Sequence, residues 1–130
     1  MTWSRFFASG AAIRFSALWA AVGVGLGAFG AHALKPVLLQ RPDGMEVWKT
    51  AVLYHLVHAV VSLVLAFQRS KSYGLPWILM MVGTLGFSGS LYLLSTLNYK
   101  AFGPVTPLGG AILLAGWIAL AAGARTQTTH

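Results

Sequence analysis

The chain has 130 residues, of which 57% are hydrophobic and 8% are charged, and its net charge is +7. One small soluble core cannot hide so much apolar surface, so the composition excludes a soluble globular protein and indicates an integral membrane protein. Because the cations stand singly at the ends of apolar runs, they suit anionic headgroups, and we expect membrane lipids as partners and no nucleic acid.

Residues 1–13 contain aromatic residues and Arg5 but no acid, so we expect an N-terminal interfacial helix or a targeting-like segment. A bilayer core takes a helix of about 20 apolar residues, and residues 14–124 form one domain with four such runs. The expected spans are residues 14–34, 48–67, 75–97 and 106–124, followed by a polar C-terminal tail at 125–130.

Short connections make consecutive spans antiparallel neighbours. The predicted fold is therefore all-α, an integral membrane antiparallel four-helix bundle. Both termini then lie on one side of the membrane, where five of the nine cations fall, so the positive-inside rule favours that side as the cytoplasm or matrix.

Small residues recur at helical spacing within the spans. In lipid, apolar burial does not drive helices together, so helices must associate through the close packing of small residues. We expect helix contacts along three stripes, one each in the first, third and fourth spans. These stripes are Ala20, Gly23, Gly27 and Gly30; Gly83 and Gly86; and Ala111, Ala115 and Ala119.

Two histidines stand three residues apart in "LYHLVHAVV", residues 53–61. On a helix, His55 and His58 share a face with Ser62. Reflecting residues through the connections puts His55 level with Gly27 and with Phe87 or Ser88, and His58 level with Val24 and Thr84. A buried imidazole needs space and a partner for each ring nitrogen, so we expect this face to point inward, towards the first span and the "GFSGSLY" segment of the third.

Four motifs resemble, in order and spacing, the membrane family known as domain of unknown function 423. They are "GAFGAHALK" (27–35), "WKTAVLYHLVHA" (48–59), "FSGSLYLL" (87–94) and "TPLGGAILLAGWIAL" (106–120). Animal transmembrane protein 256 looks like a distant relative. The resemblance implies a compact four-helix protein of a bacterial cytoplasmic or mitochondrial inner membrane, in a family without an established activity.

The resemblance also marks polar positions. The family's characteristic polar residues correspond here to His32, Tyr54, His55, His58, Ser88, Ser90, Tyr92, Thr106 and Pro107. Combined with the face of the second span, this predicts a polar interior network. Its members are His32, His55, His58, Ser62, Thr84, Ser88, Ser90 and Tyr92.

Three chemical roles compete with a structural one. His55, His58 and His32 could bind a metal or haem, but the spans hold no carboxylate and the chain has no cysteine. Ser88 lies in a G-x-S-G pattern and could act as a nucleophile with His55. A histidine relay could move protons in a small transporter or channel, although the only acids lie in the first connection.

We favour a small non-catalytic component that packs in a larger membrane complex or self-associates, with other membrane subunits or its own copies as partners. The polar network then locks one arrangement of similar helices. On this interpretation the protein is not an enzyme and has no catalytic residues, cofactor or metal ligands. A transporter or channel, or a histidine-ligated metal or haem protein, is the alternative.

Overall fold

The computed structural model describes residues 2–97 and 100–124, so the predicted tail at 125–130 lies outside the described residues. Four helices, α2, α4, α5 and α6, are long and apolar enough to cross a membrane. The predicted all-α membrane fold with four spans is therefore confirmed. The helices are α1 (Trp3–Ala8), α2 (Ala11–Ala31), α3 (Lys35–Leu39), α4 (Gly44–Phe67), α5 (Gly74–Leu97) and α6 (Val105–Gly123), with 3-10 turns η1 (Lys71–Tyr73) and η2 (Lys100–Phe102).

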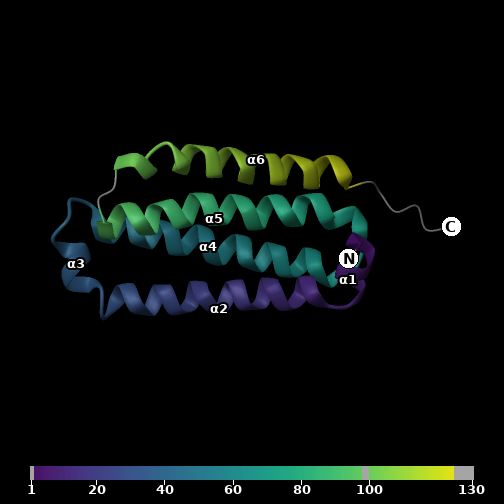
Figure 1. Cartoon of the computed structure of the whole chain (residues 1–130), viewed down its shortest axis with the longest axis horizontal. Coiled ribbons are helices and arrows are strands. Elements are labelled where there is room, and N and C mark those ends of the chain that lie inside the picture. The colour runs from purple at the N-terminus through teal and green to yellow at the C-terminus, as the bar shows by residue number, and fades with distance from the viewer. Residues whose placement is uncertain (1, 98–99, 125–130) are drawn as a thin grey trace.

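The four long helices lie side by side and alternate in direction (Figure 1). Their extensive interfaces join α2 to α4, α4 to α5 and α5 to α6. As a result α2 and α6 are edge helices, whereas α4 and α5 are covered on two sides. One end of the bundle carries α1 and the last turn of α6, and we call it the α1 end; the opposite end carries α3 and is called the α3 end.

The first connection differs most from the sequence-based expectation. The first span was expected to reach Leu34, but α2 ends at Ala31 because His32 leaves the helical conformation, with φ −120° and ψ −82°. Residues 35 and 36 then begin the short helix α3, with proline in its first turn, a position where its missing N–H costs nothing. The second long helix begins at Gly44, four residues before the apolar run that marked it in the sequence.

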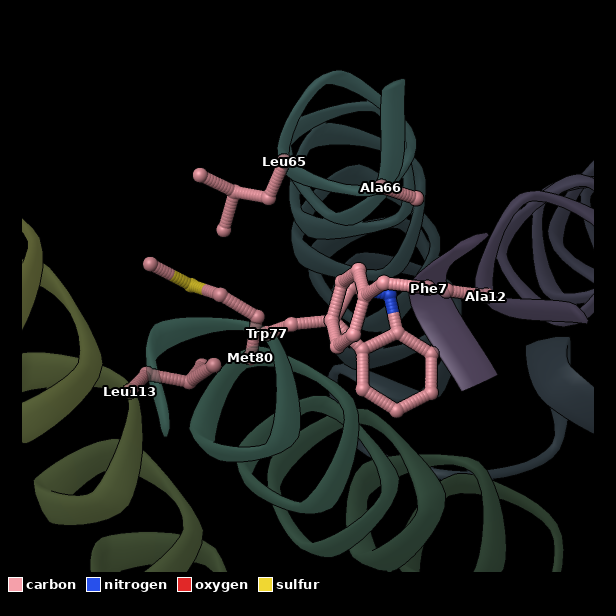
Figure 2. Packing of buried hydrophobic residues seen from close by; sticks show 7 residues of the cluster. All are labelled: Phe7, Ala12, Leu65, Ala66, Trp77, Met80 and Leu113. Carbon is pink, nitrogen blue, oxygen red and sulfur yellow. The ribbon is translucent and has the colours of Figure 1, made fainter. Parts of the chain in front are cut away.

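The N-terminal segment forms a helix that packs on the bundle. Phe7 of α1 is fully buried beside Trp77 of α5, their ring centroids 5.9 Å apart (Figure 2). The Arg69 guanidinium, from the connection after α4, donates a hydrogen bond of 3.1 Å to the Ala8 carbonyl. Residues before the first span thus belong to the fold, while their placement at the membrane surface stays a prediction.

Glycines set the distances between helices. Added β-carbons at Gly23 and Gly27 would meet Leu56 and Val52 of α4 at 2.8 and 3.3 Å. Gly30 lies directly against the Trp48 indole. On α5, a β-carbon at Gly83 would lie 2.8 Å from Leu113 of α6, while one at Gly86 would lie 3.4 Å from Gly109. Ala20, from the same predicted stripe of α2, is only partly buried.

The predicted alanine stripe of α6 was wrong. Ala111 and Ala115 are exposed and Ala119 is half-buried. The buried face of α6 consists instead of Gly109, Leu113 and Gly116. The helix turns this face to α5 because Gly109 fits directly against the backbone of residues 86 and 87, and no side chain, not even alanine's, has room there.

Candidate functional site

His55 is the polar centre of the bundle and joins three helices. Its side chain is completely buried. The ring extends from α4 and makes two hydrogen bonds of 2.9 Å, from Nδ1 to the Tyr92 hydroxyl of α5 and from Nε2 to the Trp19 carbonyl of α2. Both nitrogens of this buried imidazole therefore have partners, as the low-dielectric interior requires.

Gly23 makes the contact with α2 possible. In a regular helix the Trp19 carbonyl already accepts the N–H of residue 23, and its second lone pair stays free. A β-carbon at position 23 would stand 3.2 Å from the ring of His55. Because glycine occupies this position, the imidazole reaches the helix backbone itself, and the Trp19 ring lies over it with centroids 4.1 Å apart.

The partners of His55 determine its tautomer. A carbonyl oxygen only accepts hydrogen bonds, so the Nε2 atom facing Trp19 carries a proton. In a neutral ring Nδ1 is then the acceptor, and the Tyr92 hydroxyl donates to it. His55 is thus oriented by a carbonyl on one side and a phenol on the other.

His58 has the opposite tautomer. Its Nδ1 lies 2.7 Å from the Tyr54 carbonyl of its own helix and must donate to it. The indole N–H of Trp117 in α6 is a donor only, and it reaches Nε2 of His58 at 3.1 Å. Since all four nitrogens of the two rings are bonded, His55 connects α4 to α2 and α5, while His58 connects α4 to α6.

Hydroxyl groups divide into those that link helices and those that do not. Ser88 of α5 donates a hydrogen bond of 2.7 Å to the Ala51 carbonyl of α4, and the Ser90 hydroxyl lies 2.6 Å from the Thr106 hydroxyl of α6. By contrast, Ser62 and Thr84 are fully buried but donate to carbonyls four residues earlier in their own helices. They fill space near the histidines without joining helices.

The structure does not place His32 in the polar interior. It is exposed at the end of α2, because that helix stops at Ala31 and turns towards α3. The other seven residues of the predicted network lie within the bundle, but Thr84 does not contact His58 through a hydrogen bond. His58 turns towards Trp117 of α6 instead.

Tryptophans are the partners that sequence reasoning missed. Trp19 and Trp117 contact the histidines as described above. In addition, the Trp48 indole donates a hydrogen bond of 3.0 Å to the Leu26 carbonyl, and the Trp77 indole donates one of 2.9 Å to the Ser16 hydroxyl. A general signal existed, since an indole N–H within a bilayer needs an acceptor. The Trp19 N–H itself is buried and has no hydrogen-bond partner among the described residues.

The arrangement does not fit the chemistry of a metal site or a serine hydrolase. A metal or haem could bind His55 or His58 only by replacing a hydrogen bond between or within helices. No group of three or more His, Cys, Asp or Glu residues in the described ranges could hold an ion. The Ser88 hydroxyl is occupied by the Ala51 carbonyl, and both nitrogens of His55 have other partners, so the two do not form a dyad.

Comparisons with known proteins agree on one family of membrane proteins. A family model described as "Protein of unknown function (DUF423)" matches residues 26–110. The membrane protein YwdK of Bacillus subtilis is 42% identical over 112 residues, which cover 82% of this chain and 89% of the relative. The inner membrane protein YgdD of Escherichia coli is 38% identical over 120 residues, covering 85% and 89%. No solved structure matches the chain.

Replacing the central imidazole should loosen the bundle. His55→Leu removes two hydrogen bonds between helices, worth on average about 0.6 kcal/mol each in membranes, and leaves the Tyr92 hydroxyl without its partner. We expect a loss of about 1 to 2 kcal/mol in the free energy of unfolding, measured by thermal or steric-trap unfolding in bicelles. His32→Leu, at the exposed end of α2, is the matched control; equal stability of both variants would contradict the role given to His55.

The tautomers can be observed directly. In protein labelled with ¹⁵N-histidine, NMR should show the proton on Nε2 of His55 and on Nδ1 of His58, because each faces a carbonyl. The variants His55→Leu and His58→Leu assign the two signals. The same tautomer in both rings would show that one of the two sets of partners is wrong.

Proposed function

The chain belongs to the membrane-protein family described as protein of unknown function (DUF423), and from that premise we propose a small, non-catalytic structural component of the membrane. It packs as an accessory subunit in a larger complex or associates with its own copies. Its histidines hold helices together and carry no chemistry.

The observation that carries this proposal is that all four imidazole nitrogens of His55 and His58 are hydrogen-bonded within the chain. A ligand, metal or substrate would have to compete with a contact that holds the bundle. A transported proton would likewise have to break one of these hydrogen bonds. A relay would need a group that passes the proton on, whereas His55 and His58 each donate to a main-chain carbonyl, which only accepts.

The edge helices support a role in assembly. The side chains of α2 and α6 are mostly exposed, because each helix packs closely against only one long neighbour. Leu18 of α2 is 66% exposed and Ile118 of α6 is 68% exposed. In a bilayer these surfaces meet either lipid or another transmembrane helix, so they provide the area that a subunit needs for docking.

We place the protein in a bacterial cytoplasmic membrane, since the relatives above are bacterial and YgdD carries the name of an inner membrane protein. The α1 end carries cations such as Arg14 and Lys71, and no acid among the residues described there. Both acids lie at the α3 end, where Glu46 is 3.7 Å from Lys49. The positive-inside rule counts only Lys and Arg, and the sequence has five of these on the side of the two termini against four at the α3 end, so the rule favours the α1 end in the cytoplasm.

The orientation can be tested with introduced cysteines, since the native chain has none. Ser72→Cys lies exposed at the α1 end and Gln40→Cys at the α3 end. A membrane-impermeant maleimide added to spheroplasts should label Gln40→Cys. It should label Ser72→Cys only after the spheroplasts are lysed. The reverse pattern would invert the orientation.

The accessory role predicts reproducible co-purification. Isolation of tagged protein in mild detergent, followed by mass spectrometry, should recover either a defined membrane complex or a homo-oligomer. The same sample should contain no stoichiometric metal and no Soret band. A monomer that carries a metal or haem, or one that mediates proton flux in liposomes, would replace the structural role by binding or transport.

A further inference from the structure

A groove on the lipid-facing side of the spans separates α4 from the edge helix α6, with α5 as its floor. We call it the α4/α6 groove. Its volume is about 470 Å³, and the aromatic rings of three helices line it. The lining includes Tyr54, His58, Phe87, Gly110, Leu114 and Trp117.

Tyr54 gives this groove an unused polar group. Its side chain is 40% exposed, and its hydroxyl makes no hydrogen bond with the residues that the structure describes. It lies five residues beyond Lys49, or roughly 7 to 8 Å along the helix, and thus inside the apolar part of the span. A phenol there needs an acceptor, because hydrocarbon offers none.

The opposite edge of the molecule has a complementary surface. The side of α2 that faces away from α4 has exposed small residues at regular helical spacing. They are Ala17, Ala21, Gly25 and Ala28. A β-carbon added at Gly25 would meet nothing within 4 Å. This face allows a neighbouring helix to approach the α2 backbone closely.

We propose that α2 of a second copy of this chain occupies the α4/α6 groove. The proposal rests on the structural role proposed above and names its partner. Copies that share one membrane orientation also share depth and direction. The second α2 then runs antiparallel to α4, which is the direction in which α2 already packs on α4 within one copy (Figure 1).

The depths of the two surfaces agree. Within one chain, Gly23 meets Leu56 and Gly27 meets Val52, so Gly25 is level with Tyr54. Phe87 links Tyr54 to α6 at the same level. The Tyr54 and Phe87 ring centroids are 4.5 Å apart, and a β-carbon added at Gly110 of α6 would lie 3.5 Å from the Phe87 ring. The glycine of the exposed α2 face therefore arrives at the level of Tyr54, the residue that carries the free hydroxyl.

The chain already contains a contact of this kind. Inside the bundle, Gly23 exposes a helix carbonyl of α2 to a ring nitrogen of α4. Gly25 exposes the backbone of α2 on the opposite side, where the Tyr54 hydroxyl of a second copy can donate to a carbonyl. A helix backbone supplies acceptors at this depth, whereas the carbonyls of a phospholipid lie at the membrane interface.

Disulfide trapping in the membrane tests this contact, because the parent has no cysteine. Ala21→Cys and Leu114→Cys lie one helical turn from Gly25 and Gly110, both towards the α1 end. Placed on two differently tagged, co-expressed copies, they should form mixed dimers when isolated membranes are treated with copper-phenanthroline as oxidant. The control pairs Ala21→Cys with Ala115→Cys, which is exposed on α6 but does not line the groove. Since a disulfide needs Cα atoms within about 7 Å, we expect about tenfold less product from the control pair.

The contact joins two different surfaces of the chain, so each copy can bind one further copy at each surface, and cross-linking can extend beyond dimers. A chain that carries both Ala21→Cys and Leu114→Cys should give a ladder of dimers, trimers and larger species, whereas Ala21→Cys alone should give none. Gly25→Leu should lower the cross-linking about tenfold without lowering the melting temperature of the monomer, because that face is empty in one copy and leucine favours a helix more than glycine does. Val22→Leu, on a neighbouring exposed side of α2, is its control and should have no effect.

Several outcomes would overturn the proposal. They are equal trapping with Leu114→Cys and Ala115→Cys, dimers from Ala21→Cys alone, or a native-mass monomer that retains a phospholipid and forms no cross-link. If trapping fails while the parent co-purifies with other membrane subunits, the structural role stands and only self-association is lost. If the parent is a monomer without subunits but with transport activity, both proposals fail.

Discussion

A buried imidazole in a membrane must satisfy two nitrogens at once, and this constraint organises the bundle. His55 can meet it only where α2 presents a carbonyl and α5 presents a phenol at the same depth. A shift of one helix by a turn would separate one of these partners from the ring. Each hydrogen bond is modest in energy, but an unsatisfied nitrogen in hydrocarbon is costly. The network thus acts mainly against wrong registers.

Glycine and polar side chains work together in this design. Apolar burial cannot bring helices together in lipid, so small residues allow the approach and hydrogen bonds select its geometry. Gly23 admits His55, and Gly30 admits the Trp48 indole, which bonds the Leu26 carbonyl next to it. Side chains of α4 therefore donate hydrogen bonds to main-chain carbonyls of α2 at two depths, one near the α3 end and one deeper in the membrane. The interface is fixed in register as well as in distance.

The sequence was sufficient for the number of spans, the all-α fold and the family, because each depends on hydropathy, on short connections or on long motifs. Helix ends were less predictable: hydropathy does not record that α2 stops at Ala31 or that α4 starts before its apolar run. The rotation of α6 was missed as well, since Ala111 and Gly109 look equivalent as small residues. Only the close approach of the α5 backbone at Gly109 distinguishes them. The tryptophan partners depend on side-chain reach across helices, which helix periodicity does not encode.

The two histidines are fully hydrogen-bonded within the bundle, but two donors next to them have no partner among the described residues: the buried Trp19 indole N–H and the Tyr54 hydroxyl. His58 uses both nitrogens, and the carbonyl of Tyr54 takes part in that contact. Tyr54 also lines a groove that the chain itself does not fill. A fold that satisfies nearly all of its other buried polar groups has little reason to expose a phenol to acyl chains. The simplest physical account is that the rule which joins α4 to α2 inside one copy also operates between copies, with glycine giving access to a carbonyl and a ring side chain donating to it.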